Sequence, residues 1–515
     1  MIHRREFLRL LGTSSVGLAL AACGVTPTPT ETPAPTAASR IVQITATPWL
    51  VTATPAPTNT ATATPTRVPE VIPGVVFPTQ DIVDAGYKKC NFSTAPDIKN
   101  LRPVEVRNLK FDVRKNLNHP DQIPIVFAGD PKTNEIVLAT RLNPQTKEYE
   151  WHVAGLRDLA DALEIRIGSN LENKIIGMWD LPPDITNNIV RNSQEEFNLA
   201  IIDSIAWALT HQPVSSTDKV IQNFKYLVDA DVASALSSSM EIRFEPLLYG
   251  STDFEWIPLL KQLKRDASSG NKLKGYIKDR IVQVVDRYGG EVNQLVVTLE
   301  AANPDDGYRD ILGLDYIPFA FKTTRQALKD KKVTAELMYD HDETFSDTSE
   351  NLKGRQIAFN LLKTIEDGDY DTVGLEGHIF VEPDQVQMWL DKERIKKVLQ
   401  LYKDRIPDGK SIKVTSIDVD LKKITSPDRF EIQAQIYRTF IQACLEFGIT
   451  HIGFWTTEGG DAYSWLVMQG NENWWYSTHA DPTLFGRDFN PLPNPKPAYF
   501  AVKTLLSQMM DKTHG

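Results

Sequence analysis

The pattern of hydrophobic and polar positions after residue 155 alternates between two kinds of segment. Short, continuously apolar runs predict buried strands, and longer runs with apolar positions at helical spacing predict amphipathic helices. We expect eight strands, at Ile165–Gly168, Leu199–Ile202, Glu241–Leu248, Gln294–Leu299, Thr334–Tyr339, Thr372–Leu375, Ile412–Ile417 and His451–Trp455. The clearest helical runs are Asp310–Lys329, Asn351–Glu366, Asp384–Tyr402 and Asp428–Phe447. This alternation predicts an α/β fold, a (β/α)8 TIM barrel over residues 155–515.

The region before the barrel has a different pattern. Strand-like runs at Ile123–Phe127, Glu135–Leu142 and Tyr149–Val153 are separated by turn-forming residues such as Asn143 and Pro144. We therefore expect a small β-rich appendage over residues 76–154. Residues 23–75 are built largely of Thr, Pro and Ala, with few large apolar side chains. This composition predicts a disordered, extended tether.

The first 22 residues have the features of an export signal. Arg4 and Arg5 precede an apolar run of small residues from Leu10 to Ala22, and the arginine pair resembles a twin-arginine signal. Leu20-Ala21-Ala22-Cys23 resembles a bacterial lipobox, in which Cys23 is the lipid attachment site. A transmembrane anchor is the alternative, but the run is shorter than the ~20 residues that span a bilayer. We expect an exported lipoprotein, held by acylated Cys23 in the lipid bilayer at the outer face of a bacterial cell membrane.

Composition narrows the class of protein further. The 515 residues are 41% hydrophobic and 24% charged, as in a soluble globular protein, and the net charge is −11. An acidic balance without a basic stripe argues against nucleic acid as a partner. Three cysteines, none in a C-x-x-C pair, suggest no zinc site, and we expect no metal and no cofactor. If Cys23 is acylated, Cys90 and Cys444 either are two free thiols or form one disulfide with each other. The sequence does not determine the oligomeric state.

Polar and aromatic residues follow the predicted strands, where a barrel gathers its functional loops. Several carboxylates around an aromatic-lined cleft are typical of a carbohydrate site, because sugars stack on aromatic rings while carboxylates do acid/base work. The alternative for any single residue is a solvated loop position. The candidates are Glu245, Tyr249, Glu300, Glu376, His378, Ser416, Asp418, Trp455, Glu458, Asp461 and Trp465.

Motifs at both ends of the predicted barrel resemble glycoside hydrolase family 10, the endo-β-1,4-xylanases. Asp481-Pro482-Thr483-Leu484-Phe485 and Lys496-Pro497-Ala498-Tyr499 are similar to the closing segment of that family. Asp461-Ala462-Tyr463-Ser464-Trp465 resembles its "D-x-x-S-W" loop. Leu156-Arg157-Asp158-Leu159-Ala160 resembles its opening helix. The resemblance brackets the whole barrel.

The resemblance also implies roles for individual residues. Glu300 takes the position of the acid/base glutamate, although Leu299 replaces the asparagine that precedes it in the family. Ser416 takes the position of the nucleophile, and a serine hydroxyl is a poor substitute for a carboxylate that forms a glycosyl ester. Glu376 replaces the family's glutamine beside the retained His378.

At other positions, this chain either keeps or lacks the residue that the family has. Trp455 and Trp465 are kept as a sugar platform, whereas the histidines of the strand that carries Glu245 and Tyr249 are lost. With Asp418, these residues remain substrate-binding candidates.

Three functions follow from these observations. The first is a surface lipoprotein that binds or acts on a β-1,4-linked polysaccharide such as xylan without the usual retaining chemistry, a pseudoenzyme of the xylanase type. The second is a divergent glycosidase that uses Glu300 with another carboxylate, for which Glu376, Glu245, Asp418 and Glu458 are the candidates. In the sharpest form of this hypothesis, Glu376 acts as a base opposite Glu300 and converts a retaining site into an inverting one. The third is a structural envelope protein that neither binds nor cleaves sugars.

Overall fold

The eight apolar runs form eight parallel strands that close into a barrel. The computed structural model describes residues 110–114, 125–129, 136–142, 149–171, 183–205, 211–212, 221–222, 228–250, 267–303, 306–342, 344–347, 349–455, 461, 480–489 and 493–512. The barrel strands are β5 (Arg166–Asn170), β6 (Leu199–Ile202), β9 (Glu241–Phe244), β11 (Gln294–Leu299), β12 (Glu336–His341), β13 (Thr372–Phe380), β14 (Ser411–Asp420) and β15 (His451–Phe454). Each strand pairs with the next, β15 pairs with β5, and β9 pairs with β11, so the ring is closed. The predicted (β/α)8 TIM barrel is confirmed.

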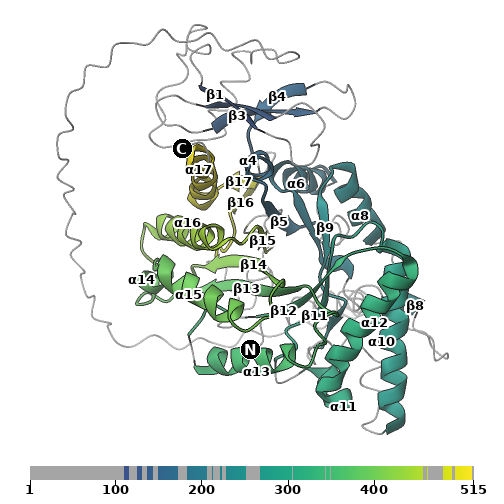
Figure 1. Cartoon of the computed structure of the whole chain (residues 1–515). Coiled ribbons are helices and arrows are strands. Elements are labelled where there is room, and N and C mark those ends of the chain that lie inside the picture. The colour runs from purple at the N-terminus through teal and green to yellow at the C-terminus, as the bar shows by residue number, and fades with distance from the viewer. Residues whose placement is uncertain are drawn as a thin grey trace, which may run out of the picture. The chain divides into compact units, whose positions relative to one another are not determined.

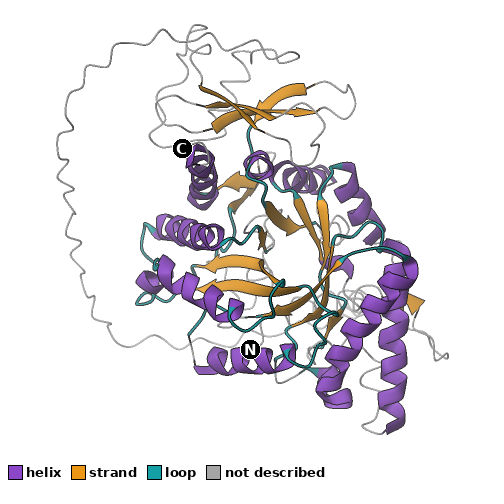
Figure 2. Cartoon of the chain, in the orientation of Figure 1, coloured by secondary structure: helices purple, strands orange, loops and turns teal. Residues whose placement is uncertain are grey.

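Helices connect the strands and lie outside them (Figure 1). In Figure 2 the purple helices surround the orange barrel strands. These helices are α4 (Leu156–Ala162), α6 (Pro183–Glu196), α8 (Val228–Ser237), α10 (Ala267–Tyr288), α11 (Gly307–Leu312), α12 (Tyr316–Lys331), α13 (Ser349–Leu362), α14 (Val386–Trp389), α15 (Lys392–Lys403), α16 (Arg429–Phe447) and α17 (Pro497–Lys512). Strands buried on both faces need such a cover, which is why they read as continuous apolar runs.

Side chains at the helix ends explain where several helices start and stop. Asp391 accepts hydrogen bonds from the backbone N–H groups of Glu393 and Arg394 at the start of α15. Such a cap satisfies donors that have no partner inside the helix. A different helix, α16, ends at its C-terminus with Gly448. The φ of Gly448 is +96°, a left-handed conformation that glycine adopts without steric cost.

The barrel interior is crossed by a charged side chain. Arg243 on β9 is fully buried, and its Nη2 donates a hydrogen bond to the carbonyl of Thr415 on β14. Gly453 on β15 makes room for this contact, because a Cβ atom there would lie 2.1 Å from the Thr415 carbonyl oxygen and 2.7 Å from Nη2 of Arg243. A residue with a side chain at position 453 would displace the arginine.

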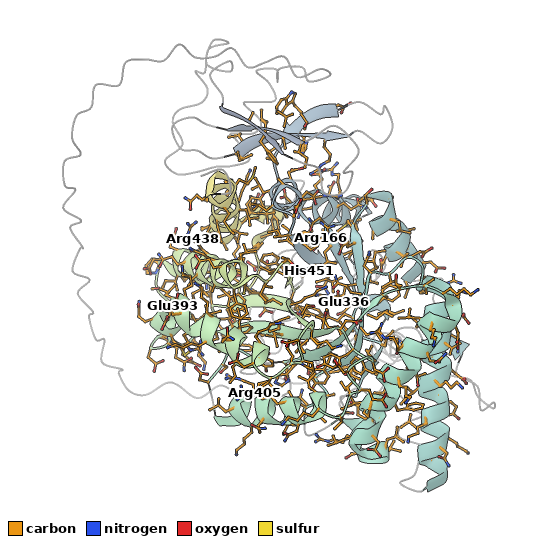
Figure 3. All side chains as sticks on the ribbon, in the orientation of Figure 1. Arg166, Glu336, Glu393, Arg405, Arg438 and His451 are labelled. Carbon is orange, nitrogen blue, oxygen red and sulfur yellow. The ribbon has the colours of Figure 1, made fainter. Side chains whose placement is uncertain are left out.

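Ion pairs join strands that are not adjacent in the sheet at the N-terminal end of the barrel. Arg166 of β5 lies 2.5 Å from Glu241 of β9, and His451 of β15 lies 3.7 Å from the same glutamate. Figure 3 labels Arg166 and His451, which are register partners at the point where the last strand meets the first. These contacts stabilise the closure of the ring at the end away from the candidate site.

The predicted β appendage forms a four-stranded antiparallel sheet in the order β1-β2-β3-β4. Its strands are β1 (Lys110–Arg114), β2 (Ile125–Gly129), β3 (Ile136–Leu142) and β4 (Tyr149–Val153). Arg141 and His152 of this sheet lie 2.9 and 3.0 Å from Asp158 in α4. The sheet and the first barrel helix therefore share an ion-paired contact.

Short strands complete the described structure. Leu248–Tyr249 forms β10, which adds to β11. The pairs β7 (His211–Gln212) with β8 (Ile221–Gln222) and β16 (Phe485–Phe489) with β17 (Pro493–Pro495) are antiparallel.

The predicted signal peptide, Cys23, the tether and Cys90 all lie outside the described residues. No helix within the described ranges is both long and apolar enough to cross a bilayer. Cys444 is a buried free thiol in α16.

Candidate active site

Most of the predicted site residues that the structure describes lie at the carboxyl ends of the barrel strands. Glu300 follows the last residue of β11, and Tyr249 ends the neighbouring β10. Glu376 lies inside β13 rather than after it, because this strand continues to Phe380. Since all barrel strands run parallel, these ends meet at one edge of the barrel.

Glu300 is held in one orientation by two donors. Its φ of +52° is uncommon for a residue other than glycine, and the residue is 7% exposed. The hydroxyl of Tyr249 donates to Oε2 of Glu300 at 3.0 Å, and Nδ2 of Asn303 donates to the same oxygen at 2.9 Å. Two residues predicted separately, Glu300 and Tyr249, are thus in direct contact. Asn303 did not stand out in the sequence, although it lies only three residues further on.

The pairing of β13 with β14 brings four more candidates together. Glu376 pairs in register with Ser416, and His378 pairs with Asp418. The register shifts between Leu375 and Glu376, so β14 carries one extra residue at this point. Residues opposite one another on parallel strands share a face, and so do residues two apart along a strand. All four side chains therefore lie on one face.

His378 connects two carboxylates. Its Nδ1 lies 3.0 Å from Asp418 and its Nε2 lies 3.1 Å from Glu376. Burial alone lowers the pKa of a histidine, but these two carboxylates outweigh burial and raise the pKa of His378 well above its ordinary value. The raised pKa favours the positively charged form of His378 between the two carboxylates, with a hydrogen bond to Asp418 and an ion-pair contact to Glu376.

Ser416 lies beside this group with a free hydroxyl. The residue is fully buried, and its Oγ has no hydrogen-bond partner among the described residues. A serine becomes a nucleophile when a neighbouring base accepts its proton. No such base is bonded to Oγ of Ser416 in the described part of the chain.

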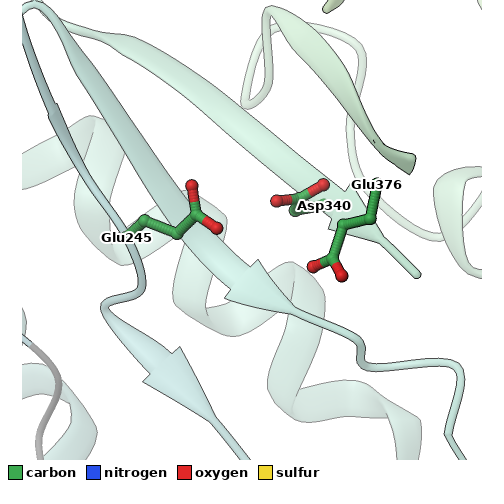
Figure 4. Close-up of side chains that lie close together, drawn as sticks. All are labelled: Glu245, Asp340 and Glu376. Carbon is green, nitrogen blue, oxygen red and sulfur yellow. The ribbon is translucent and has the colours of Figure 1, made fainter. Parts of the chain in front are cut away.

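A second group of carboxylates lies next to Glu376. One carboxylate oxygen from each of Glu245, Asp340 and Glu376 lies within 4.8 Å of the other two, and all three residues are buried. Figure 4 shows the three side chains turned toward one another, Glu245 from the segment after β9, Asp340 from β12 and Glu376 from β13. We call these three residues the carboxylate cluster. Nε of Arg243 lies 3.1 Å from Oε2 of Glu245, so one member of the carboxylate cluster is ion-paired inside the barrel.

Asp340 was not predicted, although it comes directly after the expected strand Thr334–Tyr339. Its Oδ1 accepts hydrogen bonds from Oγ1 of Thr415 at 2.8 Å and from the backbone N–H of His341 at 3.0 Å. Burial raises the pKa of Asp340 well above its ordinary value, and repulsion from Glu376 and Glu245 adds to this effect. The signal that could have found Asp340 is its place at the end of a barrel strand.

The sequence profile of glycosyl hydrolase family 10 matches residues 188–505, which cover most of the barrel. The chain belongs to this family.

Two relatives in family 10 illustrate the similarity. The chain is 26% identical to "Endo-1,4-beta-xylanase A" of Thermotoga neapolitana over 397 residues, which cover 71% of this chain and 34% of that protein. It is 25% identical to "Endo-1,4-beta-xylanase A" of Fusarium oxysporum f. sp. lycopersici over 296 residues, covering 54% of this chain and 83% of the fungal protein. The chain thus spans only about a third of the length of the Thermotoga neapolitana relative.

Solved structures share the fold of the family 10 barrel. Native xylanase 10B from Thermotoga maritima aligns with a TM-score of 0.55 and 21% identity, over 70% of this chain and 99% of that one. Xylanase B from Clostridium stercorarium F9 aligns with a TM-score of 0.51 and 22% identity, over 68% of this chain and 99% of that one. At these identities the likeness establishes the fold.

Two of the remaining predicted residues, Trp455 and Asp461, are buried in the family 10 barrel. Trp455 is 1% exposed, and its ring meets that of His378 edge-on, with the centroids 6.4 Å apart. Asp461 lies 2.9 Å from Lys496, so it binds the closing segment of the barrel. Trp465 and Glu458 lie outside the described residues.

Proposed function

We propose that this family 10 barrel binds a β-1,4-linked polysaccharide of the xylan type and does not cleave it by the usual retaining route. The relatives named as endo-1,4-beta-xylanases suggest the class of polysaccharide. The carboxyl end of the barrel, where the predicted residues gather, is where barrel proteins of this kind bind their ligands. Serine at position 416 is the single observation that carries the proposed loss of retaining chemistry.

Retaining glycosidases need two carboxyl groups, one as acid/base and one as nucleophile. By resemblance to the family, Glu300 supplies the first and position 416 should supply the second. The hydroxyl of Ser416 has no base bonded to it in the described structure, so nothing there prepares it to attack a sugar. We therefore expect the glycosyl ester not to form at Ser416.

Binding requires less than catalysis. Carboxylates accept hydrogen bonds from sugar hydroxyls, and Glu300 and Asp418 are each held in place by a neighbouring side chain, Tyr249 and His378. Side chains held in advance lose little freedom when a ligand binds. The barrel can thus keep a polysaccharide site after the nucleophile has been replaced.

A second candidate, inverting hydrolysis, is favoured by the position of Glu376. This residue is in register with Ser416 on the adjacent strand, and its carboxylate is bound to His378. A carboxylate from a neighbouring strand could then activate a water opposite Glu300. In that case Glu300 is the acid and Glu376 the base.

The test combines calorimetry with product analysis. The full chain is titrated with xylohexaose, cellohexaose and mannohexaose, and reducing-sugar release from xylan is followed in parallel. We expect saturable binding of xylohexaose without release of sugar, and binding within a few-fold in Glu300→Gln. Sugar released with retained anomeric configuration would contradict the proposal.

The same assay separates the alternatives. Inverting hydrolysis predicts products of inverted configuration, with activity lost in both Glu300→Gln and Glu376→Gln. Glu431→Gln, at an exposed position of α16, is the matched control and should behave as the parent chain. If none of the three oligosaccharides binds, the structural envelope protein is the remaining function.

We also propose that the protein is exported and anchored through acylated Cys23, with the Thr/Pro-rich residues as a tether. The arginine pair, the short apolar run and the lipobox-like residues before Cys23 support this location. Two acyl chains on one cysteine give stable anchoring, whereas a single chain is marginal. Cys23→Ala should move the protein from the membrane fraction to the supernatant, and a variant that stays with membranes would rule the anchor out.

A further inference from the structure

The carboxylate cluster contains a buried acid that lacks an opposite charge at contact distance. Asp340 is fully buried and forms no ion pair with any described residue, whereas Glu245 is paired with Arg243 and Glu376 with His378. Ionised carboxylates are strongly disfavoured away from water unless a positive charge or a proton compensates them. The carboxylate of Asp340 is thus not balanced by a positive charge in contact with it.

Two oxygen atoms are available beside the carboxylate cluster. Oδ2 of Asp340 has no hydrogen-bond partner among the described residues, while Oδ1 already accepts two hydrogen bonds. Oγ of Ser416 is likewise buried and unpartnered in the described structure. Ser416 is in register with Glu376 and shares its face, so the hydroxyl lies on the same side of the sheet as the Glu376 carboxylate. Buried oxygens of this kind are normally hydrogen-bonded or bound to a metal.

The spacing of the three carboxylates suits a particular class of ion. Ca²⁺ binds oxygens at about 2.3–2.6 Å, so two ligands on opposite sides of the ion lie up to about 4.6–5.2 Å apart. Mg²⁺ binds at about 2.0–2.1 Å, which limits the same separation to about 4.2 Å. Separations within 4.8 Å lie in the range that two oxygens bound to one Ca²⁺ ion can span.

We propose that Glu245, Asp340 and Glu376 bind one Ca²⁺ ion inside the carboxyl end of the barrel. The hydroxyl of Ser416 would be a neighbouring oxygen donor. All the ligands are oxygens, the type that Ca²⁺ prefers. The ion would join β12 and β13 to the segment that follows β9. This site gives Glu376 a role other than that of a base.

The experiment uses the full chain after treatment with EDTA and desalting. Calorimetry with CaCl2 should show one saturable site, and the melting temperature should rise with Ca²⁺ concentration because only the folded chain binds the ion. MgCl2 should bind at least tenfold more weakly. Binding of Ca²⁺ should fall at least tenfold in Asp340→Asn.

Asp340→Asn keeps the shape of the side chain and removes a buried charge, so we expect it to fold. Asp384→Asn, at an exposed position, is the matched control and should bind Ca²⁺ as the parent chain does. The proposal is overturned if the parent chain shows no saturable Ca²⁺ binding, or if Asp340→Asn binds Ca²⁺ as tightly as the parent. In the first case, protons rather than a metal ion balance the carboxylate cluster.

Discussion

Restoring a carboxylate at position 416 tests how closely this position and Glu376 are coupled. The two residues are register partners on adjacent parallel strands, which lie about 4.8 Å apart. Ser416→Glu would therefore place a new carboxylate about 5 Å from an existing one. At the effective dielectric constant of about 20 that suits protein sites, two like charges at this distance repel by about 3 kcal/mol.

The double variant Ser416→Glu/Glu376→Gln avoids this cost. It keeps the number of carboxylates unchanged, and by resemblance it gives both positions the residues of the family. We expect Ser416→Glu alone to be less stable than the double variant by about 3 kcal/mol. We expect the double variant to gain hydrolytic activity, since a correctly placed catalytic carboxylate accelerates a reaction by at least about 100-fold.

Denaturant unfolding of the parent chain and both variants tests the expected difference in stability. Reducing-sugar release from xylan tests the expected gain in activity. Glu376→Gln alone is the control, because it removes a carboxylate without supplying a nucleophile. A single variant as stable as the double variant would show that the two side chains do not approach each other. Failure of the double variant to exceed the parent's activity would refute the view that position 416 alone blocks the retaining reaction.

Four further predictions concern stability and reactivity. Burial raises the pKa of Asp420 to about 7, above its ordinary 3.8, so its proton stabilises the fold at low pH and this contribution is lost as the pH rises toward 7. Asp420→Asn should therefore be more stable than the parent at pH 8, by up to about 4 kcal/mol, with the difference vanishing below about pH 4 in thermal unfolding. Gly374→Ala should cost about 1–3 kcal/mol, because its Cβ would lie 2.6 Å from Oδ1 of Asp340. Gly275→Ala, in α10 with nothing within 4 Å, should instead gain about 0.5–1 kcal/mol by the same measurement. Cys444 is buried, which raises its thiol pKa, so it should react with a thiol reagent only after denaturation.

The barrel strands were predictable because burial on both faces leaves a local signature. β6, for example, is the run Leu-Ala-Ile-Ile, and every residue in it is buried. The strand β1 escaped prediction although its sequence, Lys-Phe-Asp-Val-Arg, alternates polar and apolar residues, because the run is short and carries three charges. A pairing partner, β2, makes it a strand.

The candidate site was predictable only in part. Glu300 and Tyr249 could be expected near each other, because both follow strands that meet at one end of the barrel. Arg243 could not, since a charged residue within a strand normally faces solvent, and only closure of the ring buries it. The extent of β13 was also underestimated, because its last residues are held by pairing with β14 and not by their own apolar character.

Closure of the ring by β15 against β5 has a consequence for how the chain folds. Arg166 and His451 are register partners, although most of the barrel sequence lies between them. Such long-range pairing makes folding slow, since chain entropy is lost before the contact is gained. A chain cut short before residue 451 would leave β5 and β14 each with an unpaired edge, and exposed strand edges of this kind promote association between molecules. Truncations from the C-terminus should therefore yield aggregates in place of shorter folded barrels.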